Sequence, residues 1–174
     1  MNPMATIEVR GELFNVEVDG PVRGPALVLS NSIGTSMGMW DAQMPVLRER
    51  FRVLRYDGRG HHMASRAGGE FTIAQLAEDA LALMDQVGFR TAHWCGCSMG
   101  GVIGQWLMLN APARLNRVVI ANSASYLGPP EKWQARLDTV AAQGTTAIAD
   151  GSVERWFTPA FRDAEPRTVE RIKA

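Results

Sequence analysis

Cysteine and histidine are scarce in this 174-residue sequence, and each shortage excludes a class of site. The two cysteines, Cys95 and Cys97, are too few for a zinc site of the four-cysteine kind. We expect both to be buried, reduced thiols and not redox groups or metal ligands. The three histidines are His61, His62 and His93, so none follows residue 93.

A net charge and a long apolar run are also absent. Lysine plus arginine and aspartate plus glutamate number 18 each, so no overall field favours nucleic acid or an acidic membrane surface. No apolar run approaches the roughly 20 residues that span a bilayer, and the N-terminus lacks a signal-peptide pattern. We therefore expect a cytoplasmic protein with neither nucleic acid nor a membrane as its partner.

The order of the apolar segments indicates an α/β fold. Two short strands with a hairpin signal between them come first, and strands then alternate with helices. Such alternation predicts a mostly parallel sheet with helices on both faces. The expected strands are residues 5–9, 13–18, 26–30, 51–56, a run that ends at Cys95, and 116–121. The expected helices are residues 39–50 with Pro45 in their path, 73–87 with Thr72 and Gln75 as a capping box, and 102–109.

Ser98 stands in the pattern Gly-x-Ser-x-Gly at residues 96–100. A serine on a sharp turn from strand to helix is forced into a strained backbone conformation, and Gly96 and Gly100 give it room. Gly101 lets the helix pack close to the sheet. The free N–H groups of the new helix point to where a negative oxygen develops in acyl transfer. The pattern is weak alone, but the strand before it and the helix after it predict a nucleophile elbow.

The last part of the chain has a different character. Three segments are predicted to be helices, residues 131–143, 145–155 and 166–173, and aromatic residues lie between them. We interpret residues 1–125 as a core domain and residues 126–174 as the start of a helical cap over the strand ends. Simple packing of these helices on the flank of the sheet is the alternative.

Taken together, these segments resemble an α/β-hydrolase, and within that superfamily the 3-oxoadipate enol-lactonases. The elbow, Cys-Gly-Cys-Ser-Met-Gly-Gly at residues 95–101, and Tyr-Asp-Gly-Arg-Gly-His at 56–61 are typical of the superfamily. The lactonase branch is favoured by Asn-Ser-Ile-Gly-Thr at 31–35 with Met-Trp-Asp-Ala-Gln at 39–43. Two stretches of the cap segment also favour the lactonase branch, Pro-Glu-Lys-Trp at 130–133 and Arg-Trp-Phe-Thr at 155–158.

The resemblance implies hydrolysis of a lactone ring ester in aromatic-compound breakdown, without a cofactor or metal. Ser98 would attack the carbonyl carbon of a small lactone or ester. The backbone N–H groups of Ile33 and Met99 would form the oxyanion hole.

The sequence departs from the family pattern in two places. Where the family has Gly-His-Gly, residues 60–62 are Gly-His-His, so we expect His62 to alter or strain that loop. In this fold the acid and the histidine base follow the serine, yet no histidine follows Ser98. His93 is on the wrong side of the elbow and should be a packed or edge residue. His61 should brace loops, with a role as substitute base as the minor alternative. We therefore expect the N-terminal part of a hydrolase, which stops within the cap.

Three interpretations remain open. The protein is an enol-lactonase-like enzyme of which this chain is part, or a related α/β-hydrolase that acts on other esters or on C–C bonds. The third is a catalytically silent chain that acts as a binding module. Its exposed sheet edge would then be open to self-association or to a partner chain.

Overall fold

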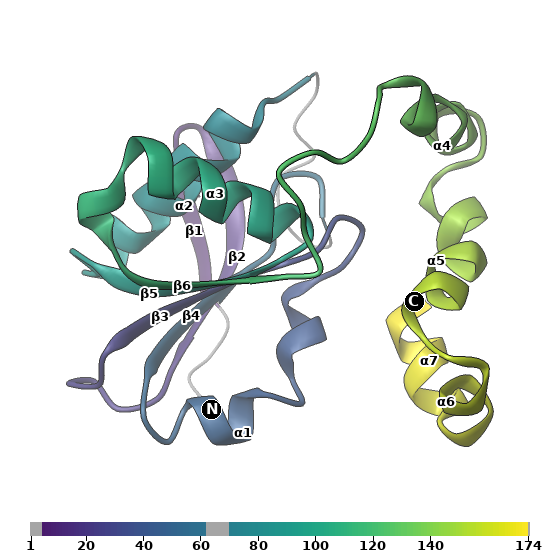
Figure 1. The fold of residues 1–174 in the computed structure, drawn as a ribbon. Helices are drawn as coiled ribbons and strands as arrows, with labels where there is room; N and C mark the ends of the chain where they lie inside the picture. The colour runs from purple at the N-terminus through teal and green to yellow at the C-terminus, as the bar shows by residue number, and fades with distance from the viewer. Residues whose placement is uncertain (1–4, 62–69, 174) are drawn as a thin grey trace. The chain divides into compact units, whose positions relative to one another are not determined.

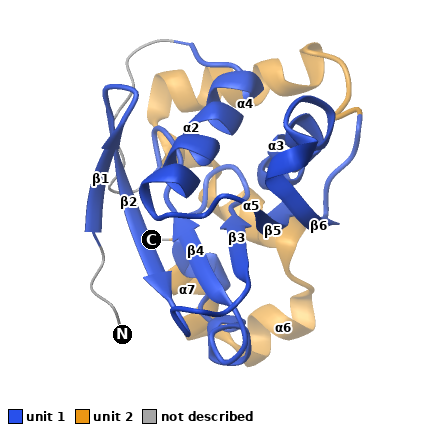
Figure 2. Ribbon diagram, turned by 90° about the vertical axis from the view of Figure 1, so that its left-hand side faces the viewer, with its two compact units in different colours: residues 1–125 blue, residues 126–174 orange. Residues whose placement is uncertain are grey.

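The structure, a computed structural model, describes residues 5–61 and 70–173. The chain divides into two compact units, residues 1–125 and residues 126–174, which Figure 2 shows in blue and orange. Each unit is described by itself.

The first unit is built on a six-stranded sheet with the strand order β1-β2-β4-β3-β5-β6 (Figure 1). The pairs β1–β2 and β2–β4 are antiparallel, whereas β4–β3, β3–β5 and β5–β6 are parallel. The mostly parallel sheet that the sequence predicts is therefore confirmed. The strands are β1 (Ala5–Val9), β2 (Glu12–Asp19), β3 (Ala26–Ser30), β4 (Arg52–Tyr56), β5 (Ala92–Cys97) and β6 (Leu115–Ala121).

Helices cover both faces of this sheet, as expected. α2 (Ile73–Gln86) and α3 (Met99–Asn110) lie on one face, and α1 (Met44–Leu47) lies on the other (Figure 1). The prediction of one helix over residues 39–50 is wrong, because the α-helix there covers only Met44–Leu47. A 3-10 helix, η1 (Met37–Trp40), precedes α1 instead. Pro45 lies in the first turn of α1, and because it has no N–H it cannot continue a helix that begins earlier.

Two local signals position these elements. Arg10 and Gly11, with φ angles of 54° and 77°, form the tight turn that joins β1 to β2. Thr72 and Gln75 form the predicted capping box at the start of α2, since the side chain of each accepts a hydrogen bond from the backbone N–H of the other.

The main hydrophobic core lies between the sheet and the helices α2 and α3. Trp94 of β5 is 1% exposed, and Leu83 of α2 and Leu107 of α3 are fully buried beside it. A smaller cluster on the opposite face joins Leu29 of β3 to Trp40 of η1. α3 packs closely on β5 because Gly104 has no side chain, and a Cβ atom there would lie 2.6 Å from the indole nitrogen of Trp94. These contacts hold the carboxyl ends of β3, β4 and β5 in fixed positions.

The regular elements of the second unit are all helices among its described residues. The helix expected over residues 145–155 is divided, and α6 was not expected. The elements are α4 (Glu131–Gln143), the 3-10 helix η3 (Thr145–Ile148), α5 (Ala149–Trp156), α6 (Pro159–Ala164) and α7 (Pro166–Lys173). Val153 and Val169 are buried within the unit, and the rings of Phe157 and Phe161 stack at 5.0 Å. That these helices cap the strand ends stays a prediction.

In the ranges that the structure describes, none of the helices combines the length and the apolar character needed to cross a bilayer.

Candidate active site

Ser98 lies in the sharp turn between β5 and α3 and has the strained backbone that the sequence predicts. Its φ and ψ angles are 52° and −112°, in a region that residues with a side chain rarely adopt. The end of β6 holds this conformation. The N–H of Ser98 donates to the carbonyl of Ala121 at 2.9 Å, and the Ser123 hydroxyl donates to the carbonyl of Ser98 at 2.8 Å.

The three glycines around Ser98 are required by close backbone contacts. A Cβ atom at Gly96 would overlap the carbonyl of Gly100, and one at Gly100 would overlap the carbonyl of Ser30. At Gly101 a Cβ atom would lie 2.6 Å from that of Ser123. The backbones at the elbow therefore approach more closely than any other residue would allow.

Asn31, the first residue after β3, ties three elements together. Its carbonyl accepts a hydrogen bond from the N–H of Gly100 at 3.0 Å. Its side-chain amide donates to the carbonyl of Tyr56 at 2.8 Å and accepts from the indole N–H of Trp40 at 2.8 Å. The loop after β3 is thereby fixed against the first turn of α3. Sequence reasoning missed this role, although an asparagine at the end of an apolar strand was a visible signal.

The two N–H groups predicted for the oxyanion hole lie on these two joined segments. Within residues 5–61 and 70–173, neither the N–H of Ile33 nor that of Met99 donates a hydrogen bond to a protein group. Met99 begins α3, where backbone N–H groups lack partners within the helix. The following N–H groups are engaged, that of Gly100 by Asn31 and that of Gly101 by Ser98. These two N–H groups are therefore free to donate, and that they form the oxyanion hole stays a prediction.

His61 braces the loop that carries Ile33. Its Nε2 atom accepts a hydrogen bond from the N–H of Gly34 at 2.8 Å, so the ring hydrogen is on Nδ1, which contacts the carbonyl of Arg59 at 2.9 Å. Because both ring nitrogens are engaged, His61 is not free to act as a base. His62, at which we expected strain, lies outside the described residues.

A buried ion pair holds the segment that carries His61. Asp79 of α2 is 1% exposed and accepts hydrogen bonds from the Nε and Nη2 atoms of Arg59 at 2.5 and 2.8 Å. The hydrogen bond to Asp79 raises the pKa of Arg59. Arg10 and Glu12 of the hairpin extend the network, at 3.4 Å from Asp79 and 3.2 Å from Arg59 respectively. Sequence analysis did not identify Asp79. It lies beside the apolar stripe of α2, where a charged residue is expected to face solvent.

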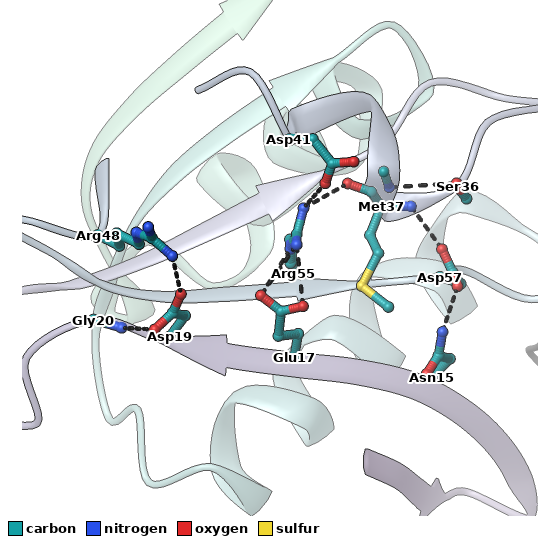
Figure 3. Close-up of polar contacts among 11 residues, drawn as sticks. Asn15, Glu17, Asp19, Gly20, Ser36, Met37, Asp41, Arg48, Arg55 and Asp57 are labelled. Atoms are coloured by element: carbon teal, nitrogen blue, oxygen red, sulfur yellow. Dashed lines mark hydrogen bonds and ion pairs between the residues drawn. The ribbon is translucent and has the colours of Figure 1, made fainter. Parts of the chain in front are cut away.

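The other acidic groups near the strand ends are also engaged. Asp57 is fully buried and accepts hydrogen bonds from the Asn15 side chain at 2.9 Å and from the N–H of Met37 at 2.7 Å (Figure 3). In the same view Arg55 lies between Glu17 and Asp41, at 3.0 and 2.6 Å. Through these contacts the carboxylates join β2 and β4 to η1 and the residue after it.

His93, Cys95 and Cys97 share one face of β5. His93 is a packed residue, as expected, with its ring edge-on to Phe51 at 5.8 Å. Both thiols are free, but they are only half-buried, so the expectation that they are buried is wrong. The smaller core cluster packs against this face, and β6 ends the sheet next to it. Burial raises the pKa of both thiols. No group of three potential metal ligands occurs among the described residues.

A recess opens next to the elbow. Its wall includes Ser32 of the loop after β3, Met99 of α3 and His61, and its cavity volume is about 20 Å³. Residues 25–151 match a known protein family, that of the alpha/beta hydrolase fold. The chain belongs to this family.

Longer relatives show which branch this α/β-hydrolase is similar to. It is 40% identical to 3-oxoadipate enol-lactonase 2 of Acinetobacter baylyi over 167 residues, which are 96% of this chain and 62% of the relative. Two crystal structures superpose with a TM-score of 0.93 each. One is a hydrolase from Pseudomonas aeruginosa PA01, at 42% identity over 99% of this chain and 66% of that one. The other is the enol-lactonase from Burkholderia xenovorans LB400, at 39% identity over 97% of this chain and 66% of that one.

The α/β-hydrolase chain thus spans somewhat less than two thirds of these relatives, and the comparisons confirm the predicted resemblance and fold class. In the family the acid and the histidine base follow the nucleophile in the chain. The sequence has no histidine after Ser98, and the two described histidines, His61 and His93, are engaged elsewhere. Ser98, Ile33 and Met99 therefore remain the residues on which a proposal of function can rest.

Proposed function

We propose that the protein is a hydrolase of carboxylic esters or lactones with Ser98 as its nucleophile, and that its substrate is 3-oxoadipate enol-lactone. One observation carries the catalytic part of this proposal. Ser98 has the backbone conformation of a nucleophile elbow, φ 52°, and the N–H groups of Met99 and of Ile33, whose loop is bonded to α3 through Asn31, are unengaged among the described residues. Enol-lactonases at 39–40% identity support the substrate.

The reaction would proceed through an acyl-enzyme. The hydroxyl oxygen of Ser98 bonds to the lactone carbonyl carbon and gives up its proton to a base. The N–H groups of Ile33 and Met99 stabilise the oxyanion of the tetrahedral intermediate, and each such donor typically contributes about 10²–10³ in rate. The ring C–O bond then breaks, and the enol oxygen takes up a proton. Water attacks the ester of Ser98 and releases the open acid.

This sequence of steps needs no metal or cofactor, because the leaving group is an enol and both steps are acyl transfers. It does need a base for the proton of Ser98. In another serine hydrolase, loss of the histidine base costs about 10⁶ in turnover. Neither described histidine is free to supply this base. The function is therefore tested on the protein produced from its own gene.

The test is a panel of substrates. We expect hydrolysis of 3-oxoadipate enol-lactone with a kcat/KM at least about 100-fold above that for p-nitrophenyl acetate, because binding of the remote substrate parts contributes to the transition state. Hydrolysis of the simple ester without turnover of the enol-lactone would contradict the substrate and favour a related esterase.

A second candidate is a silent binding module, which the engaged state of both described histidines favours. It predicts no hydrolysis of any ester in the panel. It also predicts association through β6, the strand at the edge of the sheet, whose Val119 is 55% exposed. Measurement of molecular mass in solution alongside the panel separates the two candidates.

A further inference from the structure

Cys95 and Cys97 are two thiols on one face of one strand. Residues two apart in a β-strand point to the same side, and both side chains of β5 pack against the smaller core cluster that contains Leu29 and Trp40. Both thiols are free and half-buried. They are the two cysteines of the sequence, and the proposed hydrolysis uses neither of them.

The strand disfavours a direct disulfide between these thiols. Each residue of a strand advances about 3.3 Å, so the Cα atoms of Cys95 and Cys97 lie about 6.6 Å apart. Disulfides usually join Cα atoms at most about 6.8 Å apart and prefer roughly 5.5–6 Å. One atom inserted between the sulfurs lengthens the bridge and relieves this strain. The strand therefore favours a bridging ligand over a disulfide.

The surroundings limit the number of bonds that a bridging atom makes to the protein. Within residues 5–61 and 70–173, no three histidine, cysteine, aspartate or glutamate side chains are grouped as a metal site requires. The sulfur of Met39, which packs on the same core cluster, is already engaged. It accepts from the N–H of Ser32 at 3.4 Å and from the hydroxyl of Thr35 at 3.2 Å. Zinc, which takes three or four protein ligands, does not fit this pair.

Charge decides which bridging atom fits. Burial raises the pKa of both thiols, and the neighbouring Cys97 raises that of Cys95 further. Two thiolates on a monovalent ion such as Cu⁺ would leave a negative charge against the apolar side chains of Leu29 and Trp40, which is costly. A trivalent arsenic atom with one hydrocarbon substituent forms two As–S bonds and leaves no net charge. Val119, which pairs with Cys95 on β6 and is 55% exposed, offers apolar surface to that substituent.

We propose that Cys95 and Cys97 form a dithiol site for monosubstituted trivalent arsenicals, in which one arsenic atom is bonded to both sulfurs. In the reaction with an arsenoxide, R–As=O, the two S–H bonds and the As=O bond break, and two As–S bonds form. The two thiol protons leave with the oxygen as water. Neither sulfur nor arsenic changes its oxidation state.

The experiment measures the adduct by mass, so its outcome is independent of the proposed function. The protein from its own gene is reduced, treated with phenylarsine oxide and washed with the monothiol 2-mercaptoethanol before its intact mass is measured. We expect a phenylarsenic group that resists the monothiol and is removed by the dithiol 2,3-dimercaptopropanol. Two bonds to one ligand typically strengthen its retention by about 10²–10⁴-fold over one bond.

Serine variants show whether both sulfurs are needed. Cys95→Ser and Cys97→Ser each leave one As–S bond, so we expect at least about 100-fold less monothiol to release the group. The double variant, with both substitutions, measures any label elsewhere in the protein and should lack the resistant adduct. Circular dichroism checks that each variant is folded.

The wild type provides a test that needs no variant. After treatment with phenylarsine oxide, both Cys95 and Cys97 should be protected from N-ethylmaleimide in a peptide map. Protection of one cysteine alone, or no monothiol-resistant adduct on the folded wild type, would overturn the dithiol site. Equal retention by the wild type and either folded single variant would overturn it too. Turnover of the enol-lactone bears on the proposed function alone.

Discussion

The carbonyl oxygen of Asn31 accepts a hydrogen bond from the backbone N–H of Gly100 at 3.0 Å. This bond joins the loop that carries Ile33 to the first turn of α3, which begins at Met99. The two amides proposed to stabilise the oxyanion are thus fixed in the resting protein, and no reorganisation is needed when charge develops. The catalytic proposal depends on this preorganisation.

Gly100→Ala tests the contact between these segments. The new Cβ atom would overlap the carbonyl of Ser30, and relief requires a shift of β3 or α3. Overpacking of this kind costs about 1–3 kcal/mol, so we expect a lower free energy of unfolding and a strongly reduced kcat. Chemical denaturation and the lactone assay measure the two effects. Gly58→Ala is the matched control, because no atom lies within 4 Å of its added Cβ. Equal behaviour of the two variants would contradict this account of the elbow.

His61→Ala separates a bracing role from a catalytic one. The substitution removes the acceptor of the Gly34 N–H and leaves the loop of Ile33 free to shift. A misplacement of about 1 Å can cost about 10²-fold in rate, so we expect kcat to fall by roughly 10- to 100-fold. A loss near 10⁶, the size expected for a missing base, would show instead that His61 takes the proton of Ser98.

Arg59→Met tests the buried ion pair. The substitution leaves the Asp79 carboxylate buried, with Arg10 at 3.4 Å as its one remaining cation among the described residues. Removal of one partner from a buried pair costs about 3–5 kcal/mol, which equilibrium unfolding would measure. Arg48→Met is the comparison, since Arg48 contacts Asp19 at 3.4 Å on the surface (Figure 3) and such pairs contribute about 0–1 kcal/mol. Similar losses in both variants would show that burial of Asp79 is energetically unimportant.

Tyr56 gives the protein a specific alkaline sensitivity. Its hydroxyl contacts Ser30 at 3.1 Å, and burial raises its pKa from 10.0 to about 12. The folded state therefore holds this proton more tightly than the unfolded state. The resulting stability is fully present below the unfolded pKa and is lost as the pH rises through the folded one.

The expected loss between pH 10 and pH 12 is on the order of 2 kcal/mol in the free energy of unfolding. Tyr56→Phe should lack this component, whereas Tyr126→Phe, at a 72% exposed tyrosine, should keep it. Unfolding measured across this pH range in the three proteins checks the assignment. An identical pH slope in wild type and Tyr56→Phe would contradict it.

The sequence predicted those parts of the fold that depend on local pattern. The turn at Arg10 and Gly11, the capping box of Thr72 and the close glycines around Ser98 each follow from the conformations those residues favour. The unexpected helix α6 had a local signal too. Thr158 followed by Pro159 is a typical helix start, and the Thr158 hydroxyl accepts from the N–H of Phe161 at 3.3 Å.

Other features could not be read from local pattern because they join distant segments. The pairing of Arg59 with Asp79 spans 20 residues, and that of Asn31 with Gly100 spans 69 positions of sequence number. The residues next to Arg59 or Asn31 in the sequence do not indicate which distant residue will be the partner. The half-burial of Cys95 and Cys97 likewise depends on what covers a sheet face and not on their own strand.

The most direct measurement of the central claim is hydrolysis of 3-oxoadipate enol-lactone by the protein from its own gene and by its Ser98→Ala variant. The account predicts turnover by the first and a loss of about 10⁶-fold in the second, because the nucleophile is removed while the fold is kept. Activity retained by a correctly folded Ser98→Ala variant would contradict the assignment of Ser98 as the nucleophile.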